Sequence, residues 1–159
     1  MTIDRAVSIR QPWAEVILRG RKRHEYRTWG LPAKHEGVSL ALHAPALVDR
    51  AAYATQCLLH EDLPVSAVVG VVAFGIPQRV RLTSRDLRAP YADDPGCPPV
   101  SPDPWASIWA WPILRVARCV PIPCRGRLGI WTLPGDVCDL LATRELEEVT
   151  VDAGIRPTT

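Results

Sequence analysis

The sequence lacks the features that mark membrane proteins, exported proteins and the common nucleotide-dependent enzymes. No apolar run approaches the roughly 20 residues that cross a bilayer as a helix, and the first residues lack the charged and then apolar pattern of a signal peptide. It also lacks internal repeats, low-complexity tracts, a P-loop, a dinucleotide fingerprint and a Ser-His-Asp arrangement. We therefore expect a cytoplasmic protein with no membrane partner and no cofactor.

Cysteine pairs of the metal-binding kind are also missing. The five cysteines are irregularly spaced and form no Cys-x-x-Cys pair: Cys57, Cys97, Cys119, Cys124 and Cys138. An odd number without such pairs favours free thiols in a reducing compartment. We expect no metal site.

Lysine is scarce, because only Lys22 and Lys34 are lysines among 19 basic residues. A desolvated lysine can lose its proton and act as a base or nucleophile, whereas an arginine cannot. Chance placement is the alternative explanation for Lys22. If Lys22 acts in chemistry, its replacement by alanine should remove binding or turnover and barely change the melting temperature.

The net charge is only +2, but the charges are unevenly distributed. Basic residues dominate between positions 5 and 27, and acidic residues dominate after position 135. Such an asymmetry would steer a phosphate-bearing ligand toward the basic segment. The alternative is that these charges are ordinary solvated surface.

The length of 159 residues and a hydrophobic content of 47% indicate a single domain with a real core. The alternation of apolar residues and the turn formers predict short strands and a few helices. We predict strands at 6–9, 24–29, 38–43, 66–75 and 128–133, and helices at 12–19, 49–59 and about 136–148. Residues 76–104, rich in proline and charge, are predicted to form a long irregular excursion that covers a pocket, carries part of an RNA path or is mere decoration. Residues 121–126 are predicted to turn the chain.

Tryptophans alternate along the segment that follows this excursion. Trp105, Ser107, Trp109 and Trp111 would share one side of an extended strand. If these rings are exposed, they form a surface on which bases can stack. If they are buried, they fill the core.

Residues 8–29 contain the densest group of candidate site residues. The helix from Pro12 should end at Gly20, which can adopt the left-handed conformation. Beyond it, the pattern G-x-K-x-x-E-x-R places Glu25 and Arg27 on one face of a strand, and His24 and Tyr26 on the other. Lys22 lies in the turn before them, so an amine, a carboxylate and a guanidinium should converge.

These residues resemble the ASCH (activating signal cointegrator homology) domain family of the PUA-like fold group. The resemblance rests on S-I-R-Q-P-W-A at 8–14, the G-x-K-x-x-E-x-R pattern, L-A-L-H-A at 40–44 and C-R-G-R-L-G-I-W at 124–131. It implies an α+β fold, a small, mostly antiparallel PUA-like β-barrel with two or three peripheral helices, over a single domain at 1–159. It also implies a ligand cleft between the barrel and the first helix.

Two function hypotheses follow from the resemblance and the residue chemistry. In the first, the cleft binds RNA or a modified nucleobase, since ASCH domains are viewed as RNA-associated. Stacking, guanidinium forks and amides would hold a base and its phosphate. The candidate binding residues are Ser8, Arg10, Gln11, Trp13, Arg27, His43, Arg125 and Arg127. Protein partners stay open.

In the second hypothesis, the same cleft is a hydrolase site. Some ASCH proteins remove the acetyl group from N4-acetylcytidine, and others are ribonucleases. The lysine of the amidohydrolase motif falls on Lys22, but Glu25 stands where that motif has threonine, and its further glutamate has no match here. Lys22 and Glu25 are then the candidate catalytic residues, with either one as the base that activates water, and with Arg27 or backbone N–H groups stabilising the oxyanion. The same pair would serve equally well as a structural ion pair bracing the turn.

Overall fold

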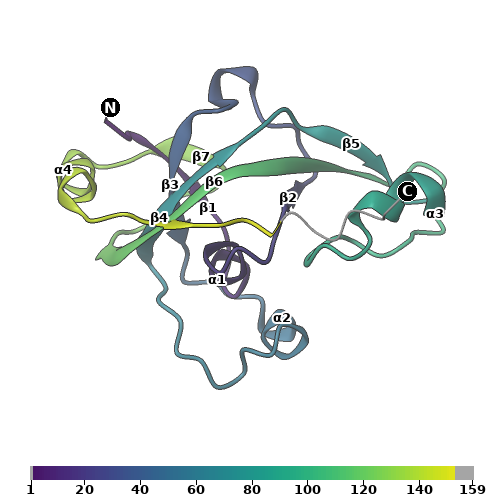
Figure 1. The fold of residues 1–159 in the computed structure, drawn as a ribbon, viewed down its shortest axis with the longest axis horizontal. Helices are drawn as coiled ribbons and strands as arrows, with labels where there is room; N and C mark the ends of the chain where they lie inside the picture. The colour runs from purple at the N-terminus through teal and green to yellow at the C-terminus, as the bar shows by residue number, and fades with distance from the viewer. Residues whose placement is uncertain (1, 153–159) are drawn as a thin grey trace.

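The computed structural model describes residues 2–152 and arranges them around an eight-stranded sheet (Figure 1). The strands are β1 (Arg5–Ser8), β2 (His24–Arg27), β3 (Ser39–Ala44), β4 (Ala67–Phe74), β5 (Gln78–Arg81), β6 (Ser107–Pro123), β7 (Ile130–Thr132) and β8 (Glu147–Val149). They follow the order β2-β6-β4-β3-β1-β7, and β5 and β8 each pair with β6 outside this path. β1 and β3 are parallel, whereas the other pairs are antiparallel.

Short helices surround the sheet. They are α1 (Trp13–Leu18), α2 (Arg50–Thr55), α3 (Arg85–Arg88) and α4 (Gly135–Thr143), with 3-10 turns η1 (Ala33–His35) and η2 (Ala89–Tyr91). In Figure 1, α1 and α2 lie below the sheet, whereas α3 and α4 lie at its two opposite ends. Of the helices in residues 2–152, none combines the length and hydropathy needed to span a bilayer.

The sheet is mixed and open, so the predicted closed and mostly antiparallel barrel is not confirmed. Among the described strands, β2 and β7 stand at the two ends of the path and no ladder joins them. The chain leaves β1 through α1 and adds β2 to β6 instead of to β1. β3 then enters beside β1 in the same direction, which produces the parallel pair.

The strand predicted at 66–75 is present as β4, whose eight residues are all buried. Gly70 lets β6 come close, because a Cβ at this position would lie 2.3 Å from the carbonyl oxygen of Ala117. The β4–β6 register shifts between Val68 and Gly70, as expected for a bulge at a glycine. The side of the sheet that faces α1 carries the main core, and α4 covers a second cluster through Val137 and Leu141.

Residues 76–104 are more regular than predicted. Gln78–Arg81 form β5, and α3 follows with Ser84 as its N-cap. β6 is 17 residues long, and its first part pairs with β2 along one edge and with β5 along the other.

Two predictions at the end of the chain are wrong. β6 continues through Pro123, where a turn was predicted at 121–126. The last helix ends at Thr143, and Glu147–Val149 form β8 on β6 where a longer helix was predicted. The hydrophobic periodicity of the sequence did not show that the edge of β6 at residues 116–118 is free to pair with one more short strand. Residues 153–159 lie outside the described part.

Candidate functional site

A cleft of about 580 Å³ opens at the end of β1, where α1 begins. Five segments form it: the β1–α1 junction, β2, the residues before α2, the residue before β4, and the loop that precedes β7. The lining residues are Ser8, Ile9, Arg10, Trp13, Glu25, Tyr26, Arg27, Pro45, Ala46, Leu47, Asp49, Ser66, Arg125, Gly126, Arg127, Leu128 and Gly129. The cleft therefore joins sequence segments that are more than 100 residues apart.

Four arginines line the cleft, and they differ in how they are engaged. Arg27 is committed to the protein, because its Nη2 donates to the carbonyl oxygen of Ser8 at 2.7 Å and its Nε lies 3.6 Å from Glu25 Oε1. Arg10, Arg125 and Arg127 are exposed, and within residues 2–152 no hydrogen bond or ion pair engages their guanidinium groups. These three side chains are therefore available to an anionic ligand.

Glu25 lies between Lys22 and Arg27, so the convergence predicted from the G-x-K-x-x-E-x-R pattern is present. Lys22 Nζ donates to Glu25 Oε2 at 3.2 Å. Both side chains are buried, with Lys22 2% exposed and Glu25 6% exposed. They differ in access, because Glu25 lines the cleft and Lys22 does not.

Aromatic rings and the 92–97 segment enclose Lys22. Its ammonium lies 5.2 Å from the ring centre of Trp13 and 5.6 Å from that of Tyr26, distances at which a cation and a ring attract each other. Gly96 closes the remaining side, since a Cβ there would lie 3.1 Å from Lys22 Cε. The excursion therefore covers Lys22.

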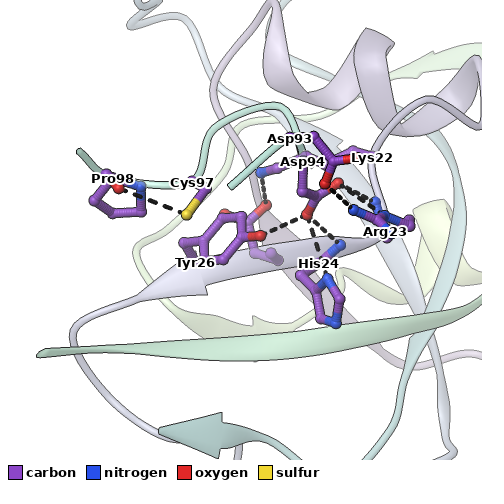
Figure 2. Close-up of polar contacts among 9 residues, drawn as sticks. Lys22, Arg23, His24, Tyr26, Asp93, Asp94, Cys97 and Pro98 are labelled. Atoms are coloured by element: carbon purple, nitrogen blue, oxygen red, sulfur yellow. Dashed lines mark hydrogen bonds and ion pairs between the residues drawn. The ribbon is translucent and has the colours of Figure 1, made fainter. Parts of the chain in front are cut away.

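Asp94 anchors this segment to β2 (Figure 2). Its carboxylate accepts from the backbone N–H groups of Arg23 at 2.8 Å and His24 at 3.1 Å, and from the Tyr26 hydroxyl at 2.6 Å. Burial alone would raise the pKa of Asp94, but hydrogen bonds from His24, the Arg23 N–H and Tyr26 outweigh it and lower the pKa below 3.8. Asp94 therefore stays ionised and holds the excursion over Lys22.

A second polar network holds the loop at 125–129. Ser8 Oγ accepts from Trp131 Nε1 at 2.9 Å, lies 2.8 Å from the Arg127 carbonyl oxygen and 3.2 Å from His43 Nδ1. His43 Nε2 lies 2.8 Å from the Cys124 carbonyl oxygen, and burial lowers the pKa of His43 despite this bond, so the imidazole is neutral and donates from Nε2. The network fixes both ends of the loop that carries the arginines.

Most candidate residues chosen from the sequence meet at this cleft. Those that line it are Ser8, Arg10, Trp13, Glu25, Arg27, Arg125 and Arg127. Three do not, namely Gln11, Lys22 and His43, which are all buried.

Gln11 and His43 have structural surroundings. The Gln11 side chain donates to the Pro64 carbonyl oxygen at 3.0 Å and accepts from the Glu15 N–H at 3.0 Å, so it ties α1 to the loop before β4. His43 is 0% exposed, and a Cβ at Gly126 would lie 2.2 Å from its Cε1. Neither side chain lines the cleft.

Asp49 is a cleft residue that sequence reasoning did not select. One of its carboxylate oxygens caps α2 by accepting from the Ala52 N–H at 3.2 Å, and the other accepts from Trp13 Nε1 at 3.1 Å. The sequence predicted a helix that begins at residue 49, but not the bond to Trp13, which depends on how α2 lies beside α1. Asp49 therefore fixes the indole at the cleft.

Comparisons with known proteins agree with the sequence resemblance. The family model "ASCH domain" matches residues 7–73. Three similar solved structures are an ASCH from Zymomonas mobilis (TM-score 0.60, 14% identity, 89% of this chain and 95% of that chain) and a serine-to-alanine and a tyrosine-to-phenylalanine mutant of it. The serine mutant has a TM-score of 0.58 at 15% identity, and the match covers 89% of this chain and 96% of the mutant chain. The tyrosine mutant has a TM-score of 0.59 at 14% identity, and the match covers 89% of this chain and 98% of the mutant chain.

Among curated proteins, no significant sequence match is found. The identity to the solved structures is low, so they show the fold alone. The resemblance to ASCH domains is confirmed: the ASCH domain model matches residues 7–73, and the solved ASCH structures share their fold with most of this chain.

Proposed function

We propose that this cleft binds RNA or a modified nucleobase. The observation that carries the proposal is the set of three exposed, uncommitted guanidinium groups, those of Arg10, Arg125 and Arg127, around a cleft lined by Trp13. Guanidinium groups match phosphate oxygens with two parallel hydrogen bonds. Aromatic rings stack on unpaired bases, which is how proteins commonly recognise single-stranded RNA.

The size and composition of the cleft support the same ligand class. A volume of about 580 Å³ lies within the roughly 300–1,000 Å³ typical of small-molecule sites, so it suits a nucleoside-sized group. The apolar side chains of Leu47 and Leu128 stand beside the arginines at the cleft. A flat ring with a polar edge and a phosphate would meet an apolar surface, hydrogen-bonding groups and positive charge together.

A binding titration tests the proposal. Fluorescence anisotropy of a labelled single-stranded RNA should give saturable binding, and the double variant Arg125→Ala/Arg127→Ala should weaken it at least 10-fold. Arg5→Ala is the matched control, because Arg5 lies at the opposite end of β1 and its ion-pair partner within residues 2–152 is the exposed Asp4, at 3.7 Å. If Arg10, Arg125 and Arg127 each contact one phosphate, log K should fall with log salt with a slope of about −2.1. Equal losses for both variants would refute the cleft as the binding site.

The second candidate function is hydrolysis in the same cleft, and the position of Glu25 favours it. Glu25 lines the cleft while it is paired to Lys22 and lies near Arg27. A water molecule in the cleft can reach the Glu25 carboxylate but not the Lys22 ammonium, because only Glu25 of the two lines the cleft. Glu25 is therefore the proposed general base. Lys22 would act through Glu25, by setting the orientation of that carboxylate.

Incubation with N4-acetylcytidine, followed by chromatography and mass spectrometry for cytidine, tests this candidate. Turnover that Glu25→Gln abolishes would support hydrolysis with Glu25 as base. Absence of turnover at high enzyme concentration would remove this acylated nucleoside as a substrate and leave the binding proposal in place.

A further inference from the structure

We infer that single-stranded nucleic acid leaves the cleft across β2, β6 and β5, along a row of residues that we call the basic row: Arg27, Trp109, Arg79, Ser107 and Arg81. This inference rests on the proposed function of the cleft and extends it to a polymer that continues beyond the cleft. It assigns a role to β5, which is part of the 76–104 excursion.

Strand register places the members of the row side by side. Arg27 of β2 is opposite Trp109 of β6, and Trp109 is opposite Arg79 of β5. The next same-face pair along β5 and β6 is Arg81 and Ser107. Directly opposed residues in antiparallel strands share one face of the sheet, so these five side chains lie on the same face.

The other face of these strands is occupied. Val80 and Ala110 are buried in a small cluster with Leu82, against which Tyr26 and Tyr91 pack. Val80 and Ala110 alternate with the row along β5 and β6, so the row must point away from this cluster. Arg79 and Arg81 accordingly lie exposed.

The row continues directly from the cleft. Arg27 lines the cleft and is also the first member of the row. Residues 29 and 30, which follow β2, also lie between the cleft and the row. A Cβ at the cleft residue Gly129 would lie 4.0 Å from Trp29, and a Cβ at Gly30 would lie 3.5 Å from Trp109 of the row. A ligand that extends out of the cleft past Arg27 therefore meets Trp109 and Arg79.

The charges on the row suit phosphate groups. Neither β5 nor the first five residues of β6 contains an acidic side chain. Arg79 is held in place by its Nε bond to Ser107 Oγ at 3.2 Å and by its position 5.9 Å from the Trp109 ring centre. Within residues 2–152, no hydrogen bond or ion pair engages the Arg81 guanidinium. Phosphates can therefore approach both arginines without meeting a carboxylate on these strands.

An exposed ring stands at the far end of the row. Trp105 lies two residues before Ser107 and is 86% exposed, which is unusual because tryptophan buries most of its surface on average. The ladder ends next to it, where the Leu82 N–H donates to the Ala106 carbonyl oxygen at 3.0 Å. A ring that no protein group covers can stack on an unpaired base, and duplex bases do not offer a free face.

The spacing of the row also fits a strand of nucleotides. Strands lie about 4.8 Å apart, so Arg27 and Arg79 are about 10 Å apart across β6, and Arg79 and Arg81 are about 7 Å apart along β5. The row is thus a narrow line of guanidinium groups with the indole ring of Trp109 between Arg27 and Arg79. A single strand can follow such a line with its phosphates on Arg79 and Arg81 and one base on Trp105.

A length series tests the inference with labelled RNA of about 3 and about 10 nucleotides, the latter within the roughly 4–16 that one small single-strand-binding domain covers. The longer RNA should bind at least 10-fold tighter. Arg79→Ser/Arg81→Ser should abolish that gain, leave the short RNA unaffected and reduce the salt slope by about 1.4. Trp105→Ala should weaken only the longer RNA, by about 10-fold. Arg5→Ala is again the control, and melting curves should show that these exposed substitutions leave the fold intact.

The outcomes separate this inference from the proposed function. If both lengths bind equally and Arg125→Ala/Arg127→Ala weakens both, the basic row is refuted and the cleft proposal stands. If a duplex of the same length binds as tightly as the single strand, the single-strand assignment is wrong. If RNA of neither length binds, both proposals fall.

Discussion

Replacement of Lys22 by alanine should destabilise the protein strongly, contrary to what the sequence alone predicts. The ammonium is 2% exposed and is the partner of Glu25 at 3.2 Å. Its removal leaves the Glu25 carboxylate buried with only Arg27 Nε nearby, at 3.6 Å. Breaking one side of a buried ion pair costs about 3–5 kcal/mol, and we expect the lower end because Arg27 remains.

The expected loss is readily measured. About 3 kcal/mol corresponds to a fall in Tm of about 6–12 °C for a domain of this size. Urea unfolding followed by circular dichroism would give the free energy directly. A Tm change below about 2 °C would refute the reasoning and restore the view that Lys22 is held for chemistry and not for structure.

A double variant separates lost charge pairing from lost packing. Lys22→Met keeps an unbranched side chain between Trp13 and Tyr26, but removes the charge. The double variant Lys22→Met/Glu25→Gln removes both charges of the buried pair, so no carboxylate is left without its ammonium partner. It should therefore recover most of the stability that Lys22→Met loses. Equal instability of the single and double variants would show that the loss comes from packing.

Three further predictions concern the supports of the cleft. Gly126→Ala should cost about 1–3 kcal/mol and weaken RNA binding, because the new Cβ would lie 2.2 Å from buried His43; unchanged urea unfolding would contradict this close packing. Asp94→Asn should release the excursion, so limited trypsin digestion should cleave after Arg85 or Arg88 faster than in the unaltered protein; equal cleavage rates would show that the other contacts suffice. Burial lowers the pKa of His43 below 6.5, so the unfolded chain takes up the proton first as the pH falls. Stability from His43 is therefore complete above about pH 6.5 and is lost on acidification, and urea unfolding from pH 7.5 to 5.5 should show a decline that His43→Gln reduces.

The local parts of this fold were predictable from the sequence. Gly20 ends α1 with φ of 72°, as its position after an apolar helical stretch predicts. The period of two along β2 correctly assigned Glu25 and Arg27 to one face, and His24 and Tyr26 to the other. Both signals depend on residues within a few positions of each other, where backbone geometry fixes which side chains meet.

Long-range contacts explain what the sequence did not reveal. The burial of Lys22 depends on Asp94 and Gly96, and Asp94 lies 70 residues beyond His24 in the chain. The sequence made His43 a candidate binding residue, but the loop at Gly126 packs directly against its ring. In both cases a distant segment covers a side chain whose local pattern predicts exposure or access.

The candidate residues therefore divide into those that can touch a ligand and those that hold the cleft in shape. Gln11 and His43 are buried and bond to the backbone at Pro64 and Cys124, so they connect α1 and β3 to two of the loops around the cleft. Arg125 and Arg127 have no such bonds from their side chains within the described residues and depend on that network for their position. Loss of a buried member should consequently lower affinity by displacing the arginines, together with stability, whereas loss of an arginine should lower affinity alone. A chain that keeps the buried network and changes the exposed arginines would keep this cleft and bind a different ligand.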